Sequence, residues 1–204
     1  MNKNYLPDPP PDPHAIAFFD GQNLYHCAKE AFGYEYPNYD VRKLAEAVCK
    51  ARGWKLTQVR FYTGVPPKER NLWWHEYWAK KKLRMSRSSV EVYTRPLRYT
   101  PELLEDGNTR YIPREKGIDV RIAIDVMTLA FKKAYDVALV FSQDQDLHEV
   151  AREIRDFALK QNRWIKMASA YPVGDGTANA RGINDTDWIV IDKATYDACL
   201  DPAG

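Results

Sequence analysis

The sequence alternates short apolar runs with amphipathic stretches along most of its length, and this alternation limits the folds open to it. The runs at residues 15–19 and 135–141 are typical of strands buried on both faces of a sheet. Helical spacing of apolar residues recurs between them, as over residues 41–53. Alternating strands and helices predict a parallel sheet with helices on both faces, so we expect an α/β fold.

The same patterns predict where the other elements lie. Further helices are expected at residues 23–32 and 69–85, after Asp146 and near the end of the chain, and further strands at residues 54–63, 89–95, 164–170 and from 188. Residues 118–133 fit either a helix or a strand by pattern, but sixteen residues is long for a strand, which favours a buried helix. Residues 96–114 are expected to form a long loop or a small hairpin.

One domain is expected over residues 14–200, preceded by an extended tail at residues 1–13 that contains five prolines. The start of the chain lacks the apolar core of a signal peptide, and no apolar run approaches the roughly 18–20 residues of a membrane span. The three cysteines are widely spaced and odd in number, which argues against a disulfide framework. We therefore expect a cytoplasmic protein without a membrane partner.

The net charge of +2 hides a strong asymmetry along the chain. Residues 42–98 contain 15 Lys and Arg against 4 Asp and Glu, a local charge of +11, whereas the remainder carries a local charge of −9. A basic segment within an acidic frame suggests a surface that binds a polyanion beside a cluster of carboxylates.

Two predicted strands end in acidic residues. Asp20 follows the strand at residues 15–19, and Asp144 follows the strand at residues 135–141. In open α/β sheets ligands bind at the carboxyl ends of strands, so both acids are expected on the functional edge. Asp119 begins the predicted buried helix and Asp125 lies within its apolar stretch, where an unpaired carboxylate would cost several kcal/mol.

Converging carboxylates repel one another, and a divalent cation relieves that repulsion. Ligands that are all oxygen favour Mg²⁺ or Mn²⁺ over zinc, and a metal-activated water suits attack on a phosphodiester. Each acid also has a simpler interpretation: Asp144 or Asp146 as a helix N-cap, Asp20 as a turn residue, and Asp125 as a hydrogen-bonded buried acid. Their joint occurrence at one edge favours a metal site.

The basic segment contains an aromatic cluster with two interpretations. On a helix, Trp73 and Tyr77 form an i,i+4 pair, as do Trp74 and Trp78. These rings could stack on bases, although packing against the sheet is the favoured interpretation. For the charges that follow, contact with nucleic acid is favoured; they are Lys80, Lys81, Lys82, Arg84 and Arg87.

Three motifs resemble those of NYN domains, the LabA-like members of the PIN-like nuclease superfamily. Residues 18–25 (FFDGQNLY) resemble the opening motif (I/F)DGxN(L/F) of that family. Residues 115–120 (EKGIDV) together with Asp125 resemble KGVDVxLAxD, and residues 135–147 resemble YDxxxLxSGDSDF. The motifs occur in the family's order and span about residues 15–160.

The resemblance implies a PIN-like three-layer α/β/α sandwich with a mainly parallel sheet and a metal-dependent ribonuclease activity. Its acidic site would be Asp20, Asp119, Asp125 and Asp144, supported by Asp146. Asn23 would orient a carboxylate or the scissile phosphate, and Ser142 and Lys116 would support the carboxylates or contact phosphate. Two positions depart from the family pattern, since Gln143 replaces the usual Gly and Leu147 the usual Phe.

We expect a Mg²⁺- or Mn²⁺-dependent endoribonuclease acting on RNA, most readily single-stranded, that leaves 5′-phosphate and 3′-hydroxyl ends. Asp20, Asp144 and one of Asp119 and Asp125 would hold the metal, with the basic segment along the same edge. One alternative is a catalytically silent RNA-binding or regulatory adaptor. A phosphotransfer domain is disfavoured because Gln22 stands where the dehalogenase pattern needs a second Asp. The oligomeric state, a homo-oligomer included, and the choice of RNA over DNA stay open.

Overall fold

Six parallel strands form one sheet in the order β3-β2-β1-β6-β7-β8. The computed structural model describes residues 7–202 apart from residue 105. The strands are β1 (His14–Asp20), β2 (Lys55–Val65), β3 (Val90–Pro96), β6 (Val137–Phe141), β7 (Lys166–Pro172) and β8 (Asp187–Ile191). This arrangement confirms the predicted parallel sheet.

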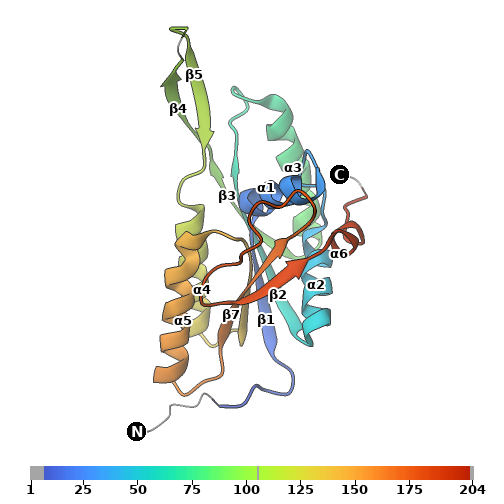
Figure 1. The fold of residues 1–204 in the computed structure, drawn as a ribbon, viewed down its shortest axis with the longest axis vertical. Coiled ribbons are helices and arrows are strands. Elements are labelled where there is room, and N and C mark those ends of the chain that lie inside the picture. The colour runs from blue at the N-terminus through green and yellow to red at the C-terminus, as the bar shows by residue number, and fades with distance from the viewer. Residues whose placement is uncertain (1–6, 105, 203–204) are drawn as a thin grey trace.

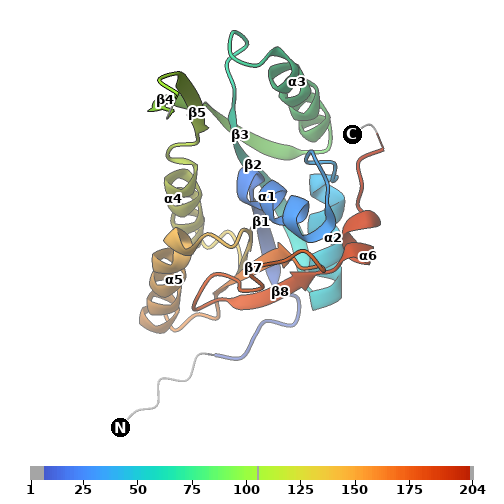
Figure 2. The ribbon, with the colours of Figure 1, turned by 45° about the horizontal axis from the view of Figure 1, so that its top comes forward.

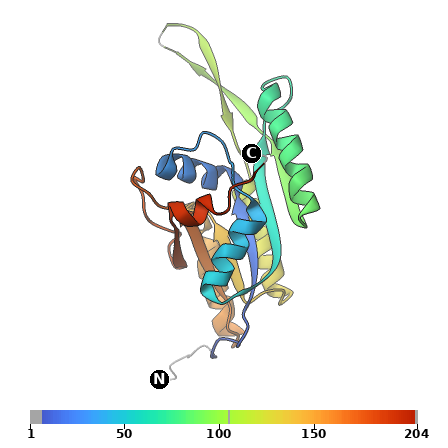
Figure 3. The ribbon, with the colours of Figure 1, turned by 90° about the vertical axis from the view of Figure 1, so that its right-hand side faces the viewer.

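Helices cover both faces of the sheet (Figure 1, Figure 3). One layer consists of α1 (Gly21–Phe32), α2 (Val41–Arg52), α3 (Leu72–Arg87) and α6 (Lys193–Asp197), and the other of α4 (Ile118–Phe131) and α5 (His148–Lys160). Strand β1 shows why, because its side chains alternate between the two cores: Ala17 and Phe19 pack into the first layer, and Ile16 and Phe18 into the second. The three-layer α/β/α sandwich is therefore confirmed.

The segment between β3 and α4 forms an antiparallel hairpin, which settles the open choice between a loop and a hairpin. Strands β4 (Arg98–Leu103) and β5 (Thr109–Arg114) pair only with each other and project away from the main sheet (Figure 1, Figure 2). The guanidinium of Arg70 lies 5.2 Å from the ring centroid of Tyr99 and 4.8 Å from that of Tyr111. This stacking joins the base of the hairpin to the loop before α3.

The ambiguous segment at residues 118–133 is a helix, as predicted, and ends at Phe131. Residues 7–13 of the predicted tail contain no helix or strand, whereas residues 1–6 lie outside the described residues. Within the described part of the chain, no helix is both long and apolar enough to cross a bilayer. The division into a tail and one domain over residues 14–200 stays a prediction.

The strand order reverses direction at β1. The chain runs from β1 outwards through β2 to β3, then returns to place β6 on the other side of β1. The carboxyl ends of β1 and β6 therefore lie side by side, with Phe19 paired to Phe141 in register. Such a switch point is where open α/β sheets bind their ligands.

Candidate active site

Asp20 and Asp144 both cap helices at this switch point. A carboxylate oxygen of Asp20 accepts a hydrogen bond from the backbone N–H of Asn23 at 3.0 Å, which caps α1. Asp144 in the same way accepts one from the N–H of Asp146 at 3.0 Å and begins the short 3₁₀ helix η1 (Gln145–Leu147). The simpler N-cap interpretation is thus correct for Asp144, yet both acids also line one cleft.

Ser142 and Asn23 hold the two strand ends together. The hydroxyl of Ser142 donates to Asp20 at 3.4 Å and accepts the N–H of Asp144 at 3.1 Å. The side-chain oxygen of Asn23 accepts the N–H of Gln143 at 2.9 Å. Because Ser142 is buried, its role here is to position the two carboxylates rather than to touch a ligand.

The cleft has a volume of about 490 Å³ and collects acidic residues from three parts of the chain. Its lining residues are Asp20, Gln22, Asn23, His26, Arg114, Glu115, Lys116, Gly117, Ile118, Asp119 and Asp144. The structure therefore brings together three of the predicted acids, Asp20, Asp119 and Asp144, as well as Asn23 and Lys116.

Glu115 is a cleft residue that the sequence patterns did not single out. Its carboxylate accepts a hydrogen bond from the backbone N–H of Gly64 at the end of β2. Burial is the largest cause that raises the pKa of Glu115 to about 7, and the negative charges of Asp20 and Asp119 contribute to the same shift. A side chain at Gly64 would collide with this carboxylate and with Leu97, so the glycine permits the close approach.

The pKa of Asp20 is also raised, to about 6. Burial is the largest cause and the charge of Asp144 adds to it, while hydrogen bonds from Asn23 and Ser142 act in the opposite direction. The cleft thus contains two carboxyl groups, those of Asp20 and Glu115, whose negative charge is poorly stabilised by their surroundings. Such a site gains free energy from a bound cation.

The structure does not place Asp125 in the cleft. Its carboxylate lies 3.1 Å from Arg60 and 3.0 Å from Arg121, and it accepts a hydrogen bond from the hydroxyl of Tyr62 at 2.8 Å. Six residues separate Asp125 from Asp119 along α4, so the two side chains point to different sides of the helix. Two arginines and a tyrosine thus satisfy the buried carboxylate, as the simpler interpretation of Asp125 expects.

Asp146 likewise lies outside the cleft. Its side chain is exposed, and its contact with the site is the backbone N–H that Asp144 caps. The geometry gives Asp146 a supporting role only through its main chain.

Neighbouring Gln143, where the family usually has glycine, anchors a loop. The side-chain amide of Gln143 donates to the carbonyl oxygens of Asn179 and Arg181 at 2.8 and 2.7 Å. Its side-chain oxygen accepts the thiol of Cys27 at 2.9 Å. This departure from the family pattern therefore ties residues 179–181 to α1 and to the end of β6.

The basic side chains of α3 also lie away from the cleft. Because β2 and β3 are parallel, α3 runs back against them, and its first turn lies at the carboxyl edge while its last turn lies far from it. None of the five predicted phosphate contacts lines the cleft: these are Lys80, Lys81, Lys82, Arg84 and Arg87. The cations that do line it are Arg114 and Lys116.

Lys81 is the clearest example of a basic residue of α3 that has a structural role. The side chain is buried, and its ammonium donates to the backbone oxygen of Tyr39 at 2.8 Å and lies 3.6 Å from Asp201. Burial lowers the pKa of Lys81 to about 8. Lys81, Arg84 and Arg87 line a separate cavity of about 330 Å³.

The aromatic cluster divides between core and surface. Trp78 is buried and packs into the core on the side of α1 and α2, as the favoured interpretation expects. Trp73 is 59% exposed, and Trp74 is half-buried.

The acidic side chains of the cleft are of the kind that binds a hard divalent cation, although they do not lie close enough together to form a set of metal ligands. Its candidate ligands Asp20, Glu115, Asp119 and Asp144 offer only carboxylate oxygens, the donors that Mg²⁺ and Mn²⁺ prefer. Within the described residues, however, no three His, Cys, Asp or Glu side chains are close enough together to hold a metal ion.

Comparison with known families places the chain. The family model for the NYN domain matches residues 15–169, a range that includes every acidic residue of the cleft. The chain belongs to the NYN family. NYN domains are PIN-like nuclease domains, in agreement with the sheet and the two helix layers described above.

A solved structure supports the fold. A protein of unknown function from Vibrio parahaemolyticus is similar with a TM-score of 0.54 at 15% sequence identity, over 90% of this chain and 95% of that chain. At this identity the likeness concerns the fold alone. Among curated proteins, none matches the sequence.

Proposed function

We propose that this NYN protein is a metal-dependent endoribonuclease and that the cleft at the switch point is its active site. The observation that carries the proposal is that Asp20, Glu115, Asp119 and Asp144 all line one cleft at the carboxyl edge of the sheet. The raised pKa values of Asp20 and Glu115 support it, because perturbed carboxyl groups in a cleft are typical of functional sites.

Each cleft residue has a role in this proposal. Asp20, Glu115, Asp119 and Asp144 would hold Mg²⁺ or Mn²⁺, which when bound would supply a water of lowered pKa as the nucleophile. Ser142 keeps Asp20 and Asp144 in place through its two hydrogen bonds. Arg114 and Lys116 lie at the cleft, where their charges would hold the phosphate backbone of the RNA.

The proposal is tested with the purified full chain and labelled single-stranded RNA. Cleavage is expected with Mn²⁺, and none with EDTA. Asp144→Asn is expected to slow cleavage by at least about 100-fold. Loss of a residue that only supports a metal ligand already costs up to about 100-fold in activity, and Asp144 is proposed as a ligand itself. Asp192→Asn is the matched control, because Asp192 also caps a helix, α6, but lies outside the cleft. Cleavage in EDTA, or full activity of Asp144→Asn, would contradict the proposal.

The silent RNA-binding adaptor is kept as a second candidate because one observation favours it. The carboxylates share a cleft but are not gathered as a ligand cluster within the described residues. An adaptor would bind RNA with an affinity that falls as the salt concentration rises, and it would not cleave the RNA when Mn²⁺ is added. Its Asp20→Asn variant would bind RNA as tightly as the wild-type protein. Cleavage that depends on Asp144 excludes this candidate.

A further inference from the structure

A second cavity, of about 290 Å³, adjoins the acidic cleft. Four elements or their ends build it: α1, the end of β2, the start of α3 and the base of the hairpin. Its lining includes Gln22, Tyr25, His26, Gly64, Trp74 and Tyr99. We call it the aromatic cavity.

The rings that line the aromatic cavity are held in place by their neighbours. The centroids of Tyr25 and Trp74 lie 6.2 Å apart in an edge-to-face arrangement, and the hydroxyl of Tyr25 donates to the carbonyl oxygen of Glu35 at 2.7 Å. Tyr99 lies under the guanidinium of Arg70. The cavity therefore offers preformed flat apolar surfaces rather than mobile side chains.

The aromatic cavity shares lining residues with the acidic cleft. Gln22 and His26 line both. Gly64 lines the aromatic cavity, and its N–H donates to Glu115, which lines the cleft. A molecule with a flat apolar part and an adjacent anionic part could therefore occupy both at once.

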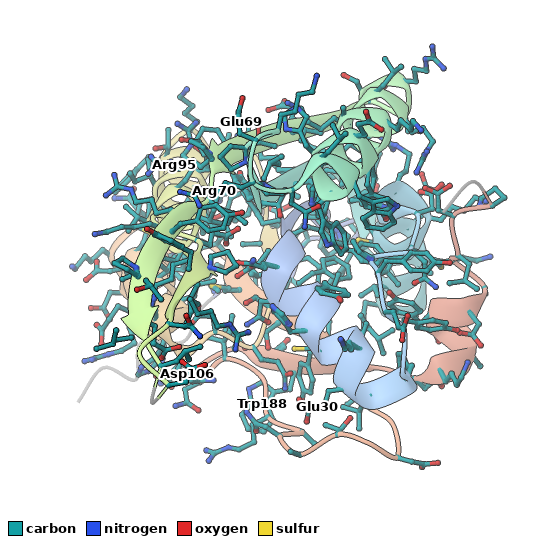
Figure 4. The ribbon with its side chains drawn as sticks, turned by 90° about the horizontal axis from the view of Figure 1, so that it is seen from above. Glu30, Glu69, Arg70, Arg95, Asp106 and Trp188 are labelled. Carbon is teal, nitrogen blue, oxygen red and sulfur yellow. The ribbon has the colours of Figure 1, made fainter. Side chains whose placement is uncertain are left out.

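Positively charged side chains lie at the cleft and beside the hairpin. Arg114 and Lys116 line the cleft, and the backbone oxygen of Lys116 accepts a hydrogen bond from Arg95 at 3.4 Å. Arg70 and Arg95 both lie beside the hairpin in the view from above (Figure 4). Positive charge beside an aromatic surface matches a nucleotide, with its anionic phosphate and its stacking base, better than it matches an apolar peptide.

We propose that the aromatic cavity binds one unstacked nucleobase of a single-stranded RNA whose backbone lies in the acidic cleft. The inference deepens the proposed function and rests on it for the placement of the phosphate. A base site of this kind would favour single strands, since a base within a duplex cannot leave its stack without loss of pairing and stacking.

The first test measures affinity without cleavage. Binding of a labelled single-stranded RNA oligonucleotide is followed by fluorescence anisotropy in EDTA, so that the strand stays intact. Tyr99→Ala is expected to weaken binding about tenfold, within the range measured for loss of one stacked base. Tyr111→Ala is the matched control, because Tyr111 also stacks on Arg70 from the hairpin but does not line the aromatic cavity.

A second pair of variants tests the opposite wall. Trp74→Ala is expected to weaken binding as Tyr99→Ala does, and Trp73→Ala is expected to leave it unchanged because Trp73 lies outside the cavity. Should Trp74→Ala not fold, the hairpin pair Tyr99→Ala and Tyr111→Ala still decides the question, since both side chains belong to a hairpin outside the two cores.

The decisive measurement combines a variant with a modified strand. In wild-type protein, an abasic site at the bound position is expected to weaken binding about tenfold, whereas in Tyr99→Ala the same abasic site should add little. Equal losses in both proteins, or wild-type affinity of Tyr99→Ala and Trp74→Ala, would overturn the inference.

These outcomes are separate from those of the nuclease proposal. Cleavage with Mn²⁺ together with unchanged binding by Tyr99→Ala would leave the proposed function standing and reject the aromatic cavity as a base site. An abasic effect that depends on Tyr99 without any cleavage would support the base site and reject the nuclease.

Discussion

Asp20 combines a structural and a functional demand in one side chain. It caps α1, a role that Asn, Ser or Thr could also fill, but it is also buried beside the charge of Asp144. In the folded protein the pKa of Asp20 is about 6, compared with 3.8 for an exposed Asp. Because the folded state then binds more protons than the unfolded state between these values, its stability falls as the pH rises through that window.

Asp20→Asn should therefore stabilise the protein in the absence of metal. At pH 8 the free energy of unfolding is expected to rise by on the order of 2 kcal/mol, since Asn keeps the cap and removes the buried charge. At pH 4, where the folded side chain already carries its proton, the gain should be small. Urea denaturation at both pH values measures the difference, and an equal effect at pH 4 and pH 8 would contradict this account.

Asp125 should behave in the opposite way. Its carboxylate is the shared partner of Arg60, Arg121 and the hydroxyl of Tyr62. Asp125→Asn is expected to lower the free energy of unfolding by about 2 kcal/mol, because Arg60 loses the buried one of its two carboxylate partners and keeps only the more exposed Glu91, 2.8 Å away. RNA cleavage per folded molecule should not change, and its loss in a protein that still folds would return Asp125 to the active site.

The acidic residues show what single positions in the sequence can and cannot reveal. Asp20 and Asp144 could be predicted because a strand end fixes where its next residue lies. The role of Glu115 could not be predicted, because an acidic residue before a helix is common in sequences. Its contact with the N–H of Gly64 exists only in the folded chain. The position of Asp125 outside the cleft could not be predicted, because its partner Arg60 on β2 is 65 residues away in sequence.

At the scale of elements, α3 separates aromatic from basic residues along its length. Its start reaches the carboxyl edge of the sheet, and Trp74 there lines the aromatic cavity. Its later turns carry Lys81 and Arg84, which bind Asp201 near the end of the chain. The +11 segment is thus not one surface, and summed charge along a sequence could not reveal the direction of the helix that carries it.

This separation predicts different salt dependences for two pairs of cations. Arg114→Gln with Lys116→Gln should weaken RNA binding and lower the slope of log affinity against log salt by about one to two, one for each lost phosphate contact. Lys80→Gln with Lys82→Gln should leave the slope nearly unchanged. Both pairs remove two charges, so net charge is controlled. A larger change of slope for the α3 pair would contradict the placement of the strand.

At the scale of the whole molecule, the layered fold was predictable and its strand order was not. The alternation of apolar and amphipathic segments is local, and it correctly predicted parallel strands between two helix layers. The return of the chain from β3 to the far side of β1 depends on contacts between distant segments. That return creates the switch point, where Asp20 and Asp144 line one cleft with residues of the segment before α4.

RNA cleavage by this protein is proposed to require a metal ion held in this cleft. Crystals soaked in Mn²⁺ and measured near the manganese edge test it most directly, because the anomalous signal locates the ion itself. A peak is expected within the cleft, where the ion is bound by Asp20 and Asp144 with Glu115 or Asp119. A soaked crystal with no peak in the cleft, or with its peak beside Asp125 instead, would contradict it.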